Sequence, residues 1–318
     1  MIKIGDREHK VIDAHAHFWN HFNGTRLGGI KLEPLGWGMV READKEYRFL
    51  APEYADNQVP AEILLAYMNE TGIDKGVILQ NPCYGDQSDY IKEVMDKNPG
   101  RFVALGLIDP RDKEGVVKRM DVYVKQYGFK GFKIEVPDVP FILDAEEYDF
   151  LWKKVVDLGV ICAFDLGWRD GPFDYNIDRL ENVMRRYPTM RTVLCHLGIS
   201  RLWDVKQAYP FPYLQRTLSL LDINKDNLYF DFSGLIDTET GFGYPEYPYV
   251  GTLSFLKATK EAWGVDRLMW GSDAPMIMRY CTYPQTLYCF TKHCDWLSPA
   301  EFEKILYSNA QHFYFNDK

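Results

Sequence analysis

The sequence predicts an α/β fold of the (β/α)8 barrel type, and three observations support this prediction. Short apolar runs rich in strand-forming residues alternate with longer segments of helical periodicity, which is the pattern of βα units around a parallel sheet. Eight such runs follow one another along the chain. Several of them end on polar residues, as expected where the carboxyl ends of barrel strands meet to form a site.

The expected strands lie near residues 10–17, 76–82, 102–109, 130–136, 160–166, 191–196, 227–233 and 267–273. Between them, apolar residues recur three and four positions apart, which indicates helices that cover the barrel. These segments are 60–71, 114–127, 144–157, 175–187 and 250–263. A final helix is predicted from Ser298, because Pro299 suits the first helical position and Glu301 can complete a capping box.

A single domain is predicted for residues 1–318. A chain with 46% hydrophobic residues can form a large core, and the sequence contains no linker, low-complexity tract or repeat that would separate two units. The segment 18–59 is much longer than an ordinary connection in a barrel. We predict that it is an insertion after the first strand, and a lid in which Trp37 closes over the substrate.

Composition excludes several classes of partner. The net charge of −9 argues against a nucleic-acid binder, because such proteins need clustered Lys and Arg. No stretch suits a signal peptide or a membrane helix, and the six cysteines are dispersed without a CxxC pair. We therefore expect a soluble, cytoplasmic protein with a small-molecule substrate, no nucleic-acid partner and no membrane partner, and we leave homo-oligomerisation open.

His15 and His17 indicate a metal site. They stand two positions apart at the end of the first expected strand, where residues of this spacing share a face, so both imidazoles can reach one ion. Asp273 ends the eighth expected strand and offers a third ligand. His196 ends the sixth strand and is predicted to belong to the same site. Cys195 is predicted to point away from the barrel centre, because successive strand residues face opposite sides.

Taken together, these motifs resemble those of the amidohydrolase superfamily, specifically its amidohydrolase-2 branch. That branch includes aminocarboxymuconate-semialdehyde and resorcylate decarboxylases as well as sugar and pyrone lactonases. The resemblance spans nearly the whole chain and rests on the order and spacing of five segments. They are IDAHAHFW at 12–19, GFKGFKI at 128–134, CHLG at 195–198, YFDFSG at 229–234 and GSDAP at 271–275.

The sequence departs from the metal-dependent members of this branch at two positions. Glu135 stands where they usually carry a histidine after the fourth-strand lysine, and Asp165 stands where they carry a fifth-strand histidine ligand. A carboxylate can also ligate zinc, and it suits manganese. The resemblance thus implies one divalent ion, zinc or manganese, held by His15, His17, Asp165 and Asp273. The alternatives are that Asp165 is a buried partner of Lys133, and that Lys133 and Glu135 form a neutralising pair.

The resemblance implies a metal-dependent hydrolase that acts on a small carboxylated cyclic substrate such as a lactone. Asp273 would take a proton from the attacking water and His196 would stabilise the oxyanion. Two other functions remain open: a non-oxidative decarboxylase of an aromatic or unsaturated acid, and a ligand-binding barrel without activity. The side chains expected to bind the substrate are Trp19, Lys133, Arg169 and Arg201, with Arg279 as a further arginine near the site.

Overall fold

The computed structural model describes residues 1–166, 177–198, 209–242 and 245–316, and the statements below concern this part of the chain. Eight parallel strands form one sheet in the order β14-β13-β12-β11-β10-β9-β8-β3. Their bounds are β3 Ile12–Ala16, β8 Lys75–Ile78, β9 Phe102–Leu107, β10 Gly131–Glu135, β11 Ile161–Asp165, β12 Arg191–Leu194, β13 Leu228–Asp231 and β14 Leu268–Met269.

The sheet closes between its first and last strands. The backbone N–H of Asp273 donates to the carbonyl of His15, and that of His17 donates to the carbonyl of Ala274, each at 2.8 Å. A closed ring of eight parallel strands is the predicted (β/α)8 barrel, and the fold prediction is confirmed. No helix among the described residues has both the length and the apolar composition of a membrane span.

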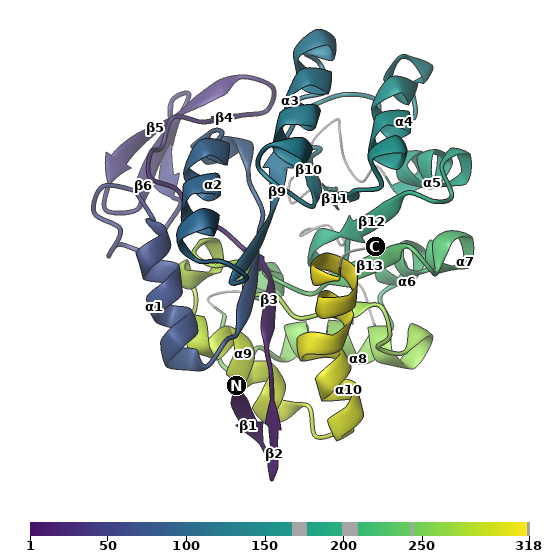
Figure 1. Cartoon of the computed structure of the whole chain (residues 1–318). Helices are drawn as coiled ribbons and strands as arrows, with labels where there is room; N and C mark the ends of the chain where they lie inside the picture. Colours follow the sequence, from purple (N-terminus) through teal and green to yellow (C-terminus); the bar gives the residue numbers. More distant parts are fainter. Residues whose placement is uncertain (167–176, 199–208, 243–244, 317–318) are drawn as a thin grey trace.

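Helices surround the strands (Figure 1). They are α1 Ala61–Thr71, α2 Ser88–Lys97, α3 Lys113–Lys125, α4 Asp149–Leu158, α5 Ile177–Arg186, α6 Pro212–Leu218, α7 Leu221–Asn224, α8 Val250–Trp263, α9 Tyr283–His293 and α10 Pro299–Glu303. The sequence prediction missed α2, α6, α7 and α9. It was right about α10, where Ser298 and Glu301 form the capping box.

The segment after β3 is an insertion, as predicted, and it contains a sheet of its own. Four antiparallel strands follow one another in it: β4 Thr25–Arg26, β5 Ile30–Gly36, β6 Met39–Glu42 and β7 Lys45–Arg48. This sheet lies beside α2, at one side of the barrel (Figure 1). Its apolar side chains, which include Leu32 and Val40, pack with Trp19 and Tyr84 in a small core.

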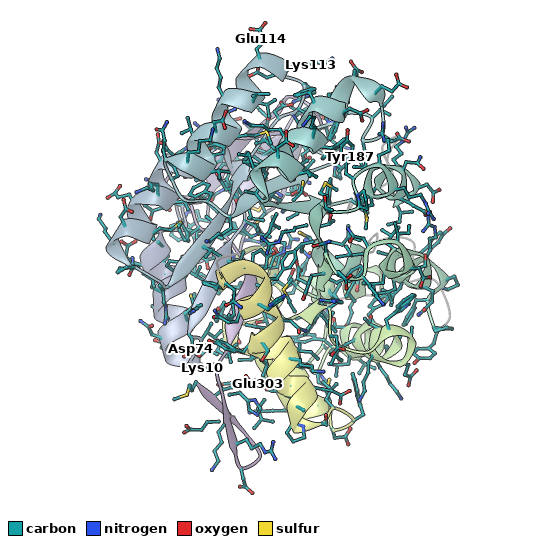
Figure 2. The ribbon with its side chains drawn as sticks, turned by 45° about the vertical axis from the view of Figure 1, so that its right-hand side comes forward. Lys10, Asp74, Lys113, Glu114, Tyr187 and Glu303 are labelled. Carbon is teal, nitrogen blue, oxygen red and sulfur yellow. The ribbon has the colours of Figure 1, made fainter. Side chains whose placement is uncertain are left out.

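The hairpin of β1 Ile2–Ile4 and β2 Arg7–His9 precedes β3 and lies at the amino-terminal end of this strand (Figure 1). Lys10, Asp74 and Glu303 lie near one another there (Figure 2). Asp74 accepts a hydrogen bond from the backbone of Val11 at 2.8 Å, and Glu303 lies 3.2 Å from His9 Nδ1. These contacts leave the carboxyl end of the strands as the end where a site can open.

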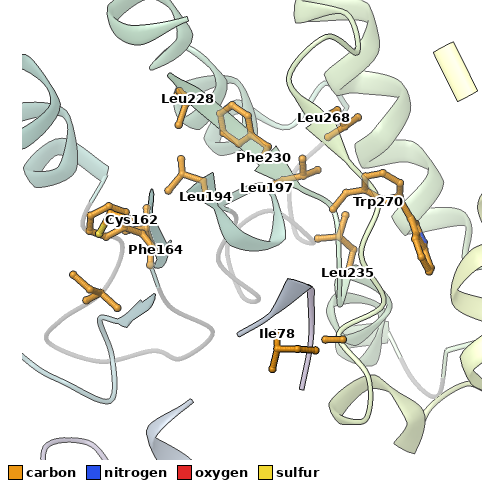
Figure 3. Packing of buried hydrophobic residues seen from close by; sticks show 14 of the residues in the cluster. Ile78, Cys162, Phe164, Leu194, Leu197, Leu228, Phe230, Leu235, Leu268 and Trp270 are labelled. Atoms are coloured by element: carbon orange, nitrogen blue, oxygen red, sulfur yellow. The ribbon is translucent and has the colours of Figure 1, made fainter. Parts of the chain in front are cut away.

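Strand alternation divides the buried side chains into two layers. On β11, Ile161 and Ala163 point into the barrel, while Cys162 and Phe164 belong to the layer between strands and helices. Figure 3 shows this outer layer, with Phe230 of β13 in the same packing. The inward-facing residues at the carboxyl ends of the strands are therefore placed to converge on the barrel axis.

An irregularity in β3 decides which side chains of the first strand face the site. Ile12 and Ala14 lie in the inner core, but Ala16 lies in the outer layer, and the pairing of β3 with β8 shifts register between Asp13 and Ala16. Regular alternation from Ile12 would direct His15 outward. The bulge changes the phase, so that His15 and His17 face the barrel axis, and bulges often re-aim side chains in this way next to active sites.

Asp13 fastens this irregular strand to the last one. Its Oδ1 accepts from the backbone of Ser272 (2.8 Å) and of His15 (3.2 Å), and its Oδ2 accepts from Ser272 Oγ (2.6 Å) and Tyr283 OH (2.8 Å). Burial raises the pKa of this carboxyl to about 6, although the four hydrogen bonds act in the opposite direction.

We expect the substitution Asp13→Ala to lower the free energy of unfolding by about 2 to 4 kcal/mol, because it leaves buried donors without an acceptor. Chemical denaturation would measure the change. Asp6→Ala, at an exposed position between β1 and β2, is the control and should change it by less than about 0.5 kcal/mol. Equal stabilities of the two variants would show that the Asp13 network does not hold the barrel closed.

Candidate active site

Three side chains converge at the carboxyl end of β3. His17 Nε2 lies 3.2 Å from His15 Nε2 and 3.2 Å from Asp273 Oδ1, and His15 Nε2 lies 3.7 Å from the same oxygen. Two of these residues come from β3 and its end, and the third follows β14 across the seam where the barrel closes. The structure therefore brings together the His-His-Asp set predicted from the sequence.

The other ring nitrogens of the two histidines are already engaged. His15 Nδ1 lies 3.1 Å from Asp231 Oδ2, and His17 Nδ1 lies 2.7 Å from the carbonyl of Leu79 and 2.9 Å from Tyr84 OH. A carboxylate and a carbonyl only accept, so each Nδ1 carries the proton and each Nε2 presents a lone pair. Burial lowers the pKa of His15, and that of His17 to about 4, so both rings are neutral at pH 7.

These three facing atoms suit a cation. Two lone pairs and a carboxylate oxygen point at one another with no proton between them, an arrangement that a positive ion would relieve. Burial opposes ionisation of Asp273, but the neighbouring histidine side chains outweigh it and hold its pKa below the usual range. The donor set, with each Nδ1 held by an acceptor behind it, is the set that metal-binding histidines use.

His196 stands across the site from β3. It follows β12 in a turn where its own φ is 56°, a left-handed conformation uncommon outside glycine. Its backbone N–H donates to Asp231 Oδ1 (3.1 Å), its Nδ1 donates to the carbonyl of Ser233 (2.9 Å), and its Nε2 lies 3.4 Å from Asp165 Oδ2. Burial lowers its pKa, but Asp165 and then Asp273 raise it to about 9. The two carboxylates therefore favour the protonated form of His196.

Lys133, Glu135 and Asp165 form a buried row next to His196. Lys133 Nζ lies 2.8 Å from Glu135 Oε2, which is the neutralising pair left open by the sequence analysis. Burial disfavours the charge of Lys133, but Glu135 holds its pKa above the usual range. Asp165 interacts with both neighbours: its Oδ2 lies 3.4 Å from His196 Nε2, and it shares a hydrogen bond with Glu135. The charge of Lys133 also acts on Asp165, so the carboxylate belongs to the buried row as well as to the imidazole.

A cavity of about 630 Å³ opens above these residues. Its floor includes His17, Lys133, Asp165, His196 and Asp273, and its roof is built from the insertion. The roof residues, half of which are charged, are Arg26, Leu27, Ile30, Glu42, Ala43, Asp44, Lys45, Tyr47, Arg48 and Phe49. A volume of this size falls within the range of small-molecule sites, and the insertion faces the site as predicted.

Two features of the backbone hold the floor in place. Asp273 has a φ of 60°, and such a conformation at a non-glycine residue is often found at functional sites. At Gly271, a Cβ atom would lie 2.8 Å from His15 Cβ and 2.9 Å from His15 N. Only glycine allows the last strand to approach His15 this closely.

Trp19 was predicted to bind the substrate, and this prediction is wrong. Its side chain is fully buried in the core of the insertion, where it stacks on Tyr84 with ring centroids 4.3 Å apart and donates to the carbonyl of Asn57 at 2.7 Å. It supports the site indirectly, since Tyr84 contacts His17. Arg169 and Arg201 lie outside the described residues. Lys133 and Arg279 do line the cavity.

Trp37 was predicted to close over the substrate, but the structure does not place it at the cavity. It lies in the turn between β5 and β6, is 66% exposed, and is not among the described residues that line the cavity. We therefore expect Trp37→Ala to leave kcat and KM unchanged and to alter the free energy of unfolding by less than about 0.5 kcal/mol. Steady-state kinetics and thermal melting would measure both. Weaker substrate binding at unchanged stability would restore the predicted role of Trp37.

The prediction for Cys195 is also wrong. Val193 and Cys195 both belong to the inner core, because residues two positions apart in a strand share a face, and His196 reaches the site because the chain turns there. Asp231 and Tyr84, which contact the Nδ1 atoms of His15 and His17, were not predicted. A carboxylate at the end of the seventh expected strand was the available signal for Asp231, whereas Tyr84 lies in a short 3-10 turn with no recognisable pattern.

Comparison with known proteins gives three kinds of match. The family model described as Amidohydrolase matches residues 12–315. An L-fucono-1,5-lactonase from Burkholderia ambifaria is 23% identical over 320 aligned positions, which cover 96% of each chain. Among solved structures, a probable 2-pyrone-4,6-dicarboxylic acid hydrolase from Acinetobacter baumannii has a TM-score of 0.68 at 18% identity, over 96% of this chain and 100% of that chain. A 2,6-dihydroxybenzoate decarboxylase from Rhizobium has a TM-score of 0.56 at 19% identity, over 79% and 86%.

Proposed function

Because the chain belongs to the amidohydrolase family and is an enzyme, we propose that it is a hydrolase that opens a small carboxylated cyclic substrate, a lactone or a related ring. The observation that carries this proposal is the convergence of His15, His17 and Asp273 at the base of a cavity, which His17, Asp273 and the neighbouring His196 line. The lactonase relative, similar along nearly its whole length, supports the same reaction class.

The ligands of the proposed metal site are His15, His17 and Asp273, with Asp165 as a fourth. The neutral imidazoles and the ionised carboxylate fit one divalent ion, zinc or manganese. When bound, such an ion supplies a Lewis acid that polarises the substrate carbonyl and acidifies water. Asp231 and the Leu79 carbonyl fix the tautomers of the two histidines, so that only Nε2 is offered toward the cavity.

Asp273 is the proposed base and His196 the proposed oxyanion donor. As water adds to the ring carbonyl, Asp273 accepts the proton that the water loses. His196 is held through Nδ1 by the Ser233 carbonyl, and its Nε2 lies beside Asp165 at the cavity. When protonated, its Nε2–H would shift from Asp165 to the negative oxygen that develops and stabilise it. When the ring C–O bond breaks, Asp273 returns its proton to the leaving oxygen. Lys133 on the wall is proposed to attract the substrate carboxylate, together with Arg169 and Arg201.

The test is ring opening by the purified enzyme. We expect a panel of aldonolactones and pyrone dicarboxylates to include a substrate whose hydrolysis releases acid, measured with a pH indicator. Treatment with a chelator should abolish this activity, and zinc or manganese should restore it. Full activity of the metal-free enzyme would refute the metal part of the proposal, and no ring opening across the panel would refute the reaction class.

A decarboxylase is the second candidate, because a cationic acid such as His196 could protonate a ring carbon before carbon dioxide leaves. The structural similarity to 2,6-dihydroxybenzoate decarboxylase is consistent with this reaction on the same fold. Incubation with hydroxybenzoic acids separates the two. Release of carbon dioxide without acid release from any lactone would favour the decarboxylase.

We expect Asp165→His to shift the zinc-to-manganese ratio of the purified enzyme toward zinc, because imidazole is the softer ligand. Mass spectrometry of the metal content would measure the ratio. Asp44→Asn, at an exposed carboxylate in the roof of the same cavity, serves as the control and should keep the original ratio. If Asp165→His also keeps it, Asp165 acts only on His196 and does not bind the ion.

A further inference from the structure

Arg26, the last residue of β4, lies in the roof of the cavity and is held in a fixed orientation. Its Nε lies 3.2 Å from Asp138 Oδ1, and its Nη1 lies 3.4 Å from Tyr47 OH. The side chain is only 17% exposed, although it lines the cavity. A guanidinium that is already oriented loses little further side-chain entropy when it binds a ligand.

The partners of Arg26 are themselves fixed. Asp138, in the loop after β10, is buried and accepts a second hydrogen bond from the backbone of Leu27 at 3.2 Å, while its carbonyl accepts from Gly28 at 2.9 Å. Tyr47 OH donates to Glu42 Oε2 at 2.7 Å. Asp138 thus binds the end of β4 to the barrel. Its contact and that of Tyr47 together fix the orientation of the Arg26 guanidinium.

Part of the guanidinium is directed to the cavity. It carries five N–H groups, and the contacts found in the described part of the chain engage Nε and Nη1. Nη2 remains as a donor on a group that lines the cavity. Arg26 of the roof and Lys133 of the floor line the same cavity.

The other cations of the roof are less constrained. Lys45 and Arg48 are exposed, and Arg48 donates to the carbonyls of Trp37 and Leu50. A buried, oriented arginine recognises a planar anion better than an exposed, flexible cation, because its parallel N–H groups match the two oxygens of a carboxylate. Arg26 is therefore the roof residue best suited to select a substrate.

We propose that Arg26 is a specificity-determining residue that binds an anionic group, a carboxylate, at the end of the substrate distant from the bond that is broken, with Asp138 as its positioning residue. This inference rests on the proposed function, since it assigns the two ends of one cavity to the two ends of one substrate. The residues of the cavity floor bind the reacting carbonyl, and Arg26 of the insertion binds the charged group at the other end of the substrate.

Calorimetric titration with two unreactive ring compounds tests the inference. Isophthalate carries two carboxylates, and its monomethyl ester has nearly the same shape with one of them neutralised. We expect the wild-type protein to bind isophthalate at least about tenfold more tightly than the ester, and Arg26→Gln to bind the two equally, with its affinity for the ester unchanged. Arg26→Lys should retain part of the preference.

Arg41→Gln is the matched control, because Arg41 lies on β6 of the same insertion, pairs with Glu33 and Glu46, and is not among the described residues that line the cavity. It should keep the wild-type preference. No preference in the wild-type protein, or a preference that survives in Arg26→Gln, would overturn the inference. If Arg26→Gln melts early and binds neither compound, Arg26→Lys decides: a retained preference supports the inference and a lost one contradicts it.

The titration requires no turnover, so its result is independent of the hydrolysis assay. Ring opening by an enzyme without the isophthalate preference would leave the proposed function standing and remove the role of Arg26. A clear preference for isophthalate in a protein that opens no lactone of the panel would support the role of Arg26 and contradict the proposed function.

Discussion

Asp273→Asn is expected to lower kcat by at least about a hundredfold while the barrel stays folded. Asp273 Oδ1 lies 3.2 Å from His17 Nε2, and its carboxylate is the proposed base. Asparagine has the same size but can neither accept the proton of the attacking water nor supply a charge, and loss of a general base costs roughly 10² to 10⁴ in rate. The barrel should stay folded, because asparagine also tolerates the left-handed backbone at this position.

The control is Asp44→Asn, which neutralises an exposed carboxylate in the cavity roof between β6 and β7. It changes the net charge by the same amount and should leave kcat within about twofold of the wild-type value. Single-turnover kinetics and thermal melting on both variants would separate a chemical effect from a folding effect. Turnover of Asp273→Asn close to that of Asp44→Asn would remove Asp273 from the mechanism.

His15→Ala is expected to lower both the metal content and kcat, the latter again by at least about a hundredfold. His15 is fully buried and directs its Nε2 toward His17 and Asp273, while Asp231 holds its other nitrogen. Alanine removes a proposed ligand and also leaves the buried Asp231 without its partner. Mass spectrometry would measure the metal, and circular dichroism would confirm that the fold persists.

His21→Ala is the matched control for this substitution. His21 is exposed, contacts Asn20 and Gln87, and is not among the described residues that line the cavity. Its removal should change neither the metal content nor the rate. A His15→Ala enzyme that keeps its metal and its turnover would disprove the assignment of the site.

The sequence predicted the barrel because its eight apolar runs alternate with amphipathic segments, and periodicity of this kind depends only on local composition. Helix α2 was missed because only two apolar side chains, Ile91 and Val94, are among its buried residues. Helix α9 does carry a capping box, formed by Thr282 and Gln285, which could have been recognised. The sheet inside the insertion was missed because its strands depend on pairing with one another.

The site was predicted in part, for reasons that differ between residues. The pair of His15 and His17 was found by its spacing, yet the inward direction of both rings depends on the β3 bulge, which no periodicity reveals. Trp19 was misassigned because a tryptophan after a ligand motif can equally well pack in a core. Arg26 was not found, since its position over the cavity results from the docking of β4 on Asp138.

Asp231 contacts both His15, at the end of the first barrel strand, and His196, after the sixth. One of its oxygens lies 3.1 Å from His15 Nδ1, and the other accepts from the backbone of His196 at 3.1 Å. Thermal breathing of the barrel, which moves neighbouring strands relative to one another, would otherwise change the spacing between the first and the sixth strand. Because both histidines are tethered to one rigid carboxylate, such motion carries them together, and the reacting groups keep their mutual geometry through the fluctuations of the fold.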